Sequence, residues 1–219
     1  FGARWFDEKW EPQFNSPEWK KTLTTYVDLM KQAGPPGASS NGFNENLALF
    51  NAGKCAMWID ATGWAPPIED PTASRVPGKV GYTVVPAGPK GHFSSTYGDG
   101  LGIAAASKNK EAAYLLCQWA VSRGQGTRLI QAGGGVPFRS SIVDDPEVAK
   151  GVKTKEWLQS VIDSSKISKL GLPVIIPVAE YRDIVGAALT ATLSGADPAT
   201  ELKKAHDQFR PILERSEKA

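Results

Sequence analysis

The spacing of apolar residues near the start of the chain predicts a helix over residues 17–33. Ser16 is a suitable N-cap and Pro17 suits the first helical position. Gly34 and the two prolines after it end the pattern. The apolar positions recur at helical spacing and form one stripe: Trp19, Leu23, Val27 and Met30.

Similar patterns predict further helices along the chain. They cover about 44–51 with Leu47 and Phe50 inward, 110–122, about 127–131, 144–165 with a break at Gly151, 179–194 and 198–218. In the helix over 110–122 we expect Asn109 to be the cap and Ala113, Leu116 and Ala120 to face inward. Trp119 and Trp157 lie on apolar helix faces, so we expect both in the core.

Short apolar runs predict strands between these helices. The runs are CAMWID (55–60), KVGYTVVP (79–86) and LGIAAAS (101–107), and the small residues of the third would let a helix pack closely. Residues 171–178 carry two prolines and are expected to be extended, and AGGGVP (132–137) can turn or hinge. The pattern as a whole predicts a helix-rich α/β fold.

Composition narrows the classes of function. The 219 residues are 41% hydrophobic and carry a net charge of +2, which is ordinary for a globular protein and gives no basis for nucleic-acid binding. No apolar stretch approaches the roughly 20 residues of a membrane span. The sequence begins at Phe1 without a signal-like segment, so we expect that it was processed, trimmed or cut from a longer chain.

No catalytic, nucleotide or metal motif is present. Cys55 and Cys117 lie in separate apolar runs and are interpreted as buried free thiols, with a disulfide as the alternative. His92 and His206 have no second ligand at a metal-binding spacing, so neither zinc nor another cofactor is expected. The acidic run at 144–147 is interpreted as a solvated helix start rather than an acid/base pair.

Four segments carry a family resemblance when taken in order. They are FNENLALFNAGKCAMWIDATGW (43–64), GKVGYTVVPAGPKG (78–91), GDGLGIAAASKNKEAAYLLCQWAVS (98–122) and GGGVPFRSS (133–141). Together they resemble the second half of the extracellular solute-binding proteins of carbohydrate ABC importers. The segments RWFDEKWEPQFNSPEWKK and GPPGASSNGFNEN resemble most the branch that binds sugar alcohols such as mannitol and sorbitol.

The resemblance implies a type II periplasmic-binding-protein-like fold, with two α/β lobes and a ligand cleft between them. This chain resembles only the C-terminal half, so the fold is expected to be incomplete on its N-terminal side. By resemblance, residues 1–85 and 136–219 belong to the second lobe and 88–135 to the first, with crossovers near 86–99 and 132–138. A half-chain that exposes a lobe-pairing surface is expected to associate with a partner.

The resemblance also implies site residues. Trp64 matches the aromatic that faces the cleft in the family, with a core position as the alternative. Tyr97 and Asp99 lie where the chain enters the first lobe; for Asp99 a plain turn role stays open. Asp60 is a further acidic candidate at the end of the expected strand.

Three more candidates lie elsewhere in the chain. Tyr181 and Arg182 match the segment that contacts sugar in relatives. The alternative for Arg182 is a surface ion pair with Glu180 or Asp183. Asn44 could reach the cleft or serve only as a helix cap.

The implied function is capture of a sugar alcohol or sugar, without catalysis, and its delivery to the permease subunits of an ABC importer. The implied location is periplasmic or extracellular. Two alternatives stay open: the same fold binding an oligosaccharide or other small solute, and a glycan-active enzyme, which would need two facing carboxylates.

Overall fold

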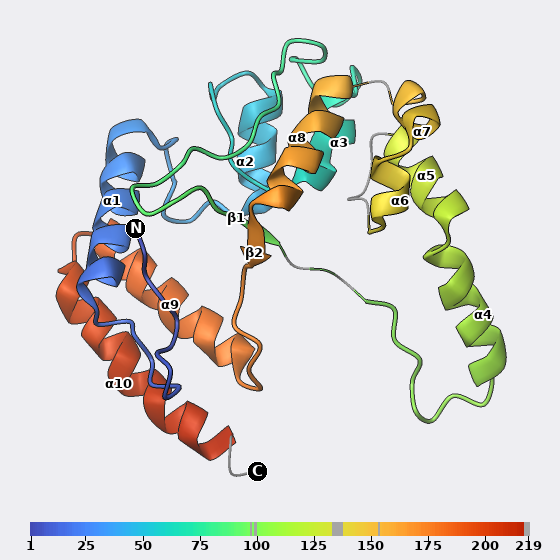
Figure 1. Cartoon of the computed structure of the whole chain (residues 1–219). Coiled ribbons are helices and arrows are strands. Elements are labelled where there is room, and N and C mark those ends of the chain that lie inside the picture. Colours follow the sequence, from blue (N-terminus) through green and yellow to red (C-terminus); the bar gives the residue numbers. More distant parts are fainter. Residues whose placement is uncertain (97, 99, 133–137, 153, 217–219) are drawn as a thin grey trace. The chain divides into compact units, whose positions relative to one another are not determined.

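The computed structural model describes residues 1–96, 98, 100–132, 138–152 and 154–216 (Figure 1). The helices in chain order are α1 (Pro17–Ala33), α2 (Phe43–Asn51), the short 3-10 helix η1 (Thr62–Trp64), α3 (Ala65–Glu69), α4 (Lys110–Ala120), α5 (Arg123–Gln131), α6 (Ser140–Val143), α7 (Pro146–Lys150), α8 (Lys155–Lys166), α9 (Val178–Leu193) and α10 (Pro198–Ser216). Strands β1 (Ser94–Thr96) and β2 (Ser168–Leu170) pair in a two-stranded sheet.

The chain divides into two compact units. Unit 1 comprises residues 1–44, 87–92 and 170–219, and unit 2 comprises 45–86 and 93–169. Both units are discontinuous in sequence. This division reflects packing within the chain itself, and the lobe boundaries given above stay a prediction.

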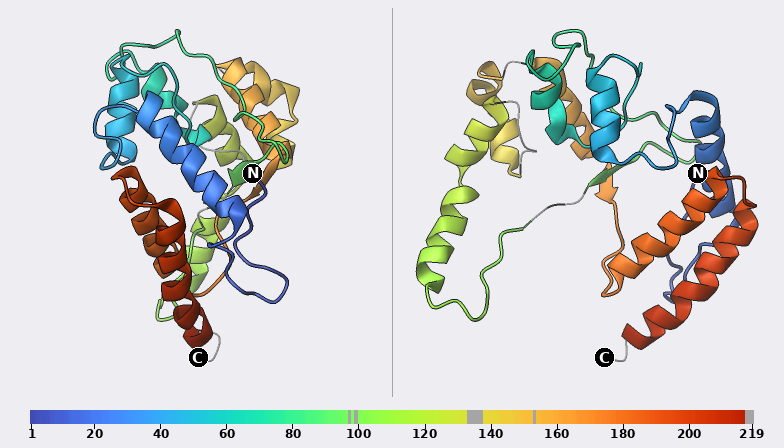
Figure 2. Two further views of the ribbon diagram at one scale, coloured as in Figure 1. Left: turned by 90° about the vertical axis from the view of Figure 1, so that its left-hand side faces the viewer. Right: turned by 180° about the vertical axis from the view of Figure 1, so that it is seen from behind.

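Unit 1 is built from α1, α9 and α10, and Figure 2 shows α9 and α10 side by side. An aromatic cluster holds them to the N-terminal segment. The ring centroid of Phe14 lies 5.4 Å from Tyr181 and 5.7 Å from Phe209, and all three side chains are buried. A second cluster joins Leu23, Val27 and Leu202. The apolar stripe predicted for the first helix is therefore confirmed in part, by its two central residues.

The helix boundaries of unit 1 follow from local chemistry. Ser16 Oγ accepts the Trp19 backbone N–H at 3.4 Å, and Pro17 opens α1 as expected. Asp197 Oδ2 accepts the Thr200 backbone N–H at 2.8 Å before α10. These capping bonds satisfy N–H groups that have no partner inside the helix.

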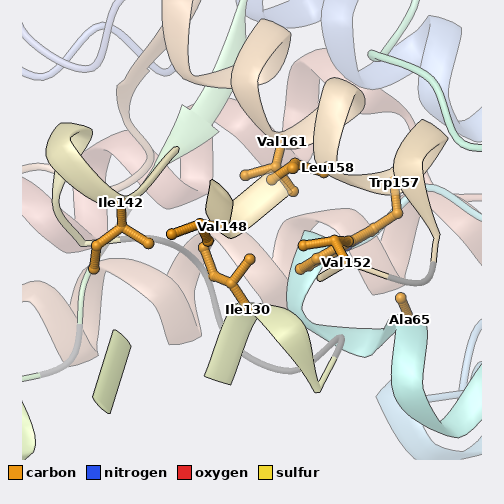
Figure 3. Close-up of a cluster of buried hydrophobic side chains, with 8 residues drawn as sticks. All are labelled: Ala65, Ile130, Ile142, Val148, Val152, Trp157, Leu158 and Val161. Atoms are coloured by element: carbon orange, nitrogen blue, oxygen red, sulfur yellow. The ribbon is translucent and has the colours of Figure 1, made fainter. Parts of the chain in front are cut away.

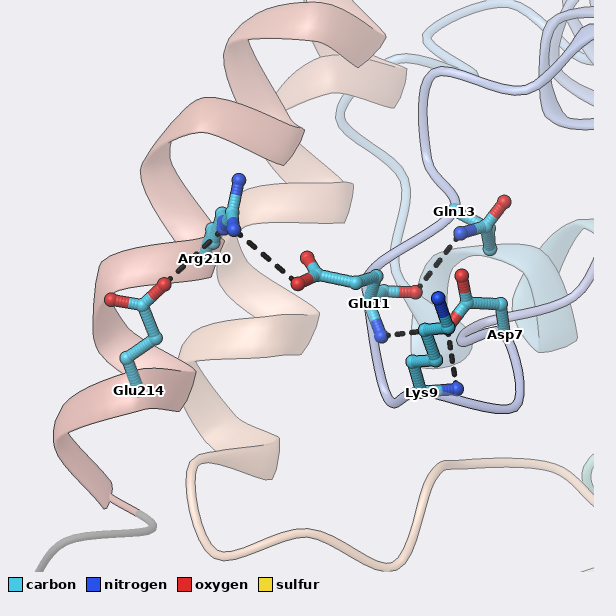
Figure 4. Close-up of polar contacts among 6 residues, drawn as sticks. All are labelled: Asp7, Lys9, Glu11, Gln13, Arg210 and Glu214. Atoms are coloured by element: carbon cyan, nitrogen blue, oxygen red, sulfur yellow. Dashed lines mark hydrogen bonds and ion pairs between the residues drawn. The ribbon is translucent and has the colours of Figure 1, made fainter.

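Polar contacts fasten the N-terminal loop to α10 (Figure 4). Arg210 lies between two carboxylates, 3.3 Å from Glu11 Oε1 and 3.2 Å from Glu214 Oε1. Asp7 Oδ1 accepts the backbone N–H groups of Lys9 at 2.8 Å and Glu11 at 3.0 Å. By accepting both N–H groups, the Asp7 carboxylate stabilises the loop conformation in which Glu11 lies next to α10.

Unit 2 has its own core, built from α3, α5, α6, α7 and α8. Its buried members are drawn in Figure 3: Ala65, Ile130, Ile142, Val148, Val152, Trp157, Leu158 and Val161. Tyr82 packs against this cluster and donates its hydroxyl to Glu69 Oε1 at 2.8 Å. Burial and the neighbouring Glu69 carboxylate raise the pKa of Tyr82 above its ordinary value.

The break predicted at Gly151 is confirmed, since α7 ends at Lys150 and α8 begins at Lys155. Asp145 caps α7 by accepting the Glu147 backbone N–H at 2.9 Å, and it forms an ion pair with Arg123. This agrees with the interpretation of the acidic run as a helix start.

The three predicted strands are wrong for the described residues. Residues 55–60, 79–86 and 101–107 join no sheet, and the strands that form are β1 and β2 instead. A strand is stable only when a neighbour satisfies its backbone N–H and C=O groups. In the part of the chain that the structure describes, these three apolar runs have no neighbouring strand. Their backbone groups therefore find no sheet to join.

The core prediction holds for one tryptophan and not for the other. Trp157 is 1% exposed, whereas Trp119 is 58% exposed. Leu116, expected inward, is 61% exposed, and Cys117 on the same helix is half-buried. Both cysteines are free thiols as expected, but neither is fully buried. No helix among the described residues is long and apolar enough to cross a membrane.

Candidate functional site

The candidate site in unit 2 is the turn from Asp60 to Trp64. Asp60 is exposed, and its Oδ1 accepts the Ala61 backbone N–H at 2.6 Å. Ala61 is the N-cap of η1 (Thr62–Trp64), which continues directly into α3 at Ala65. Asp60 thus precedes η1 and Trp64 ends it, both within unit 2.

Hydrogen bonds from other parts of unit 2 hold the backbone on both sides of Trp64 in place. The indole N–H of the buried Trp157 donates to the Thr62 carbonyl at 2.6 Å. Ala65, directly after Trp64, is 4% exposed and belongs to the same core cluster as Trp157 (Figure 3). Asn51 Nδ2 holds the next turn by donating to the Pro67 carbonyl at 3.1 Å. These contacts fix the backbone on both sides of Trp64.

Trp64 itself is 39% exposed. A partly exposed indole on an anchored turn offers a flat apolar surface at little cost in conformational entropy. The Asp60 carboxylate is an acceptor for hydroxyl groups. An exposed indole and an exposed carboxylate four positions apart in the sequence suit a ligand with C–H faces and several hydroxyls.

Tyr181 is placed differently from the sequence-based expectation. It lies near the start of α9, is 4% exposed and packs between Phe14 and Phe209. Burial raises the pKa of its phenol above the ordinary value. This position favours a packing role in unit 1 over direct contact with a ligand.

Arg182 and Asn44 are exposed residues of unit 1. The alternative of an Arg182 ion pair with Glu180 or Asp183 finds no support among the described residues, because no such pair is formed there. Helix α2 begins at Phe43, so Asn44 lies inside the first turn rather than at the cap. A ligand role for either residue stays a prediction.

Tyr97 and Asp99 lie outside the described residues, so their expected roles stay predictions. Of the remaining candidates, Asp60 and Trp64 share unit 2, while Asn44, Tyr181 and Arg182 belong to unit 1. Asp60 and Trp64 therefore lie four positions apart within unit 2.

Sequence reasoning missed the role of Trp157 in this turn. The indole and the Thr62 carbonyl are separated by 95 positions, and no local pattern connects them. The only signal was the apolar helix face that carries Trp157. Among the described residues, no group of three or more His, Cys, Asp or Glu side chains could hold a metal ion.

Comparison with known proteins identifies the family. Residues 1–127 match the family described as bacterial extracellular solute-binding protein. The mannitol-binding protein of Pseudomonas aeruginosa is 38% identical over 209 residues, which cover 89% of this chain and 48% of that protein. The chain thus spans about half the length of the curated relatives it matches.

Solved structures support the same family assignment. A solute-binding protein of an ABC transporter from Agrobacterium vitis S4, with bound D-mannitol, is 34% identical with a TM-score of 0.75, covering 98% of this chain and 55% of that one. A protein of the same description from Agrobacterium radiobacter K84, in complex with ribitol, is 30% identical with a TM-score of 0.85, covering 97% and 54%. The resemblance drawn from the ordered segments and the expected fold class are therefore confirmed. The chain belongs to the family of bacterial extracellular solute-binding proteins.

Proposed function

We propose that this chain is part of the non-catalytic binding component of an ABC importer and that it captures a sugar alcohol or a related sugar. The observation that carries the proposal is the similarity to proteins named or solved with polyols, at 30–38% identity. The exposed indole and carboxylate of the Asp60–Trp64 turn agree with that ligand class in chemistry.

The physical basis is the dual surface of a polyol. Its C–H groups stack on a flat aromatic ring, and its hydroxyls donate to carboxylates. A hydrogen bond to a charged group contributes about 1.5–3 kcal/mol net. We assign the stacking surface to Trp64 and one hydroxyl acceptor to Asp60. Arg182 and Asn44, with Asp99 and Tyr97, are proposed as further contacts.

The proposal extends to location and partners. A component that captures a solute for import works in the periplasm or at the cell surface, as the family description of an extracellular protein supports. It then delivers the solute to permease subunits. Because binding and delivery require no bond to be made or broken, no catalytic residue is assigned.

Tryptophan fluorescence tests the proposal. The unsubstituted chain and its Trp64→Ala variant are each titrated with mannitol, sorbitol, ribitol, glucose and maltose. The matched control is Trp119→Ala, which removes another exposed indole, at 58% exposure, from a different helix of unit 2. We expect a saturable change with a polyol that Trp64→Ala abolishes and Trp119→Ala retains. A response to none of these ligands, or one that survives Trp64→Ala unchanged, would contradict the assignment.

A further inference from the structure

Helix α2 (Phe43–Asn51) ends on a buried polar side chain. Asn51 is 8% exposed and lies deeper than Leu47 and Phe50, which are half-buried on the same helix. Asparagine is seldom buried, because each polar atom of its amide then needs a hydrogen-bond partner. The burial of Asn51 is therefore tied to the contacts that this amide makes.

The amide supplies a donor that α3 (Ala65–Glu69) cannot obtain from the chain directly after it. A helical carbonyl normally accepts the N–H group of the residue four positions on. For Pro67 that residue is Pro71, which has no N–H group. Asn51 Nδ2 donates to the Pro67 carbonyl at 3.1 Å instead. A side chain of another helix thus satisfies a carbonyl that α3 leaves open.

Helix α3 depends on such contacts because it is short. It has five residues, two of them prolines, and a single helical turn is marginal without tertiary support. Ala65 and Ile68 are buried, and the Glu69 carboxylate accepts the Gly78 N–H at 2.7 Å. Trp64 directly precedes this helix. The contacts that orient α3 therefore also orient the backbone that carries the Trp64 indole.

The other atom of the amide argues that asparagine contributes little to stability at this position. Asn51 Oδ1 is buried and has no partner among the described residues. A buried acceptor without a partner lowers stability, and an apolar side chain of similar size avoids that cost. The backbone carbonyl of Asn51 accepts the Arg75 N–H at 2.8 Å, but every residue type has such a carbonyl. What asparagine adds here is the Nδ2 donor to α3.

We propose that Asn51 is a positioning residue of the polyol site, whose Nδ2 group holds α3 so that Trp64 presents its indole to the ligand. Asn51 acts through α3 and not through contact with the ligand. The ligand named in this inference rests on the proposed function, whereas the effect on Trp64 does not. Loss of the donor should therefore change the environment of Trp64 even when no ligand is present.

Fluorine NMR of the ligand-free chain tests the positioning. Labelling with 5-fluorotryptophan gives each of the seven indoles its own resonance, and Trp64→Phe identifies that of Trp64. In Asn51→Leu we expect the Trp64 resonance to shift or broaden, while that of Trp119 on α4 stays in place. The matched control is Gln13→Leu, which removes a similar bond in unit 1, from Gln13 Nε2 to the Glu11 carbonyl at 3.1 Å. It should leave the Trp64 resonance unchanged.

Urea unfolding and a mannitol titration complete the test. We expect Asn51→Leu to unfold near the midpoint of the unsubstituted chain, because losing one hydrogen bond and removing one unpaired acceptor have opposite effects. Its affinity for mannitol should fall about tenfold, as when a supporting contact of a binding residue is lost.

An unmoved Trp64 resonance in Asn51→Leu overturns the inference, and a lowered midpoint beside it would leave Asn51 a structural role only. An equal effect of Gln13→Leu on that resonance also overturns it. If the resonance moves in Asn51→Leu alone but the unsubstituted chain binds no mannitol, the positioning of Trp64 stands and the polyol assignment fails.

Discussion

Replacement of Trp157 by phenylalanine tests how the core of unit 2 supports the turn that carries Trp64. Trp157 is 1% exposed, and its indole N–H donates to the Thr62 carbonyl at 2.6 Å. Phenylalanine keeps an aromatic ring at the same place but removes the donor and part of the ring volume. The loss therefore has two components that can be assigned magnitudes.

Loss of the hydrogen bond costs about 0.5–1.5 kcal/mol net. Loss of roughly two buried carbon atoms costs about 0.8 kcal/mol each. The expected decrease in the free energy of unfolding is therefore about 2–3 kcal/mol. Because Thr62 belongs to η1, we also expect the fluorescence of Trp64 to change in the folded variant.

Urea unfolding followed by circular dichroism measures the effect. The midpoint should fall without a change in the slope of free energy with urea, since the surface exposed on unfolding stays nearly the same. Trp119→Phe is the matched control: that indole is 58% exposed, so its replacement should change stability by no more than about 0.5 kcal/mol. Equal effects of the two substitutions would refute the reasoning that the buried indole anchors the turn.

Two further predictions concern unit 1. Phe209→Ala should lower the free energy of unfolding by about 3–5 kcal/mol, because it empties the centre of the aromatic cluster, whereas Phe93→Ala, at a side chain 53% exposed, should cost far less in the same urea experiment. Burial holds the pKa of Tyr181 above its ordinary value, so the contribution of this group to stability is complete below the unfolded-state pKa of about 10 and is lost as pH rises through the folded pKa. Ultraviolet titration should show that Tyr181→Phe removes a late-ionising phenol; removal of an early one would contradict the buried placement.

Local sequence was a good guide to several helix ends, although it placed the start of α5 at about 127 instead of Arg123 and predicted no helix at 65–69 or 140–143. Ser16 with Pro17, and Gly151, each marked a boundary that the structure confirms. Such signals work because a capping bond or a helix break involves residues only a few positions apart.

Local sequence was a poor guide to the strands. Residues 55–60 and 101–107 have the composition of buried strands, yet they join no sheet among the described residues. Alternate apolar side chains in this chain stay strongly exposed, such as Met57 at 83% and Ile59 at 63%. A strand-like pattern indicates which side chains a segment would bury. The strand itself forms only where a neighbouring strand satisfies its backbone N–H and C=O groups.

The sequence by itself determined some helix ends, such as the start of α1, the order of motifs that identifies the family, and the residue types suited to a polyol. The tertiary structure alone decided which side chains are accessible. Trp119 and Trp157 both lie on apolar helices, yet one is exposed and the other buried; Tyr181 is packed among aromatics, while Trp64 is held at the surface. The physical reason is that capping and periodicity act over a few residues, whereas burial depends on partners distant in sequence, such as Thr62 for Trp157.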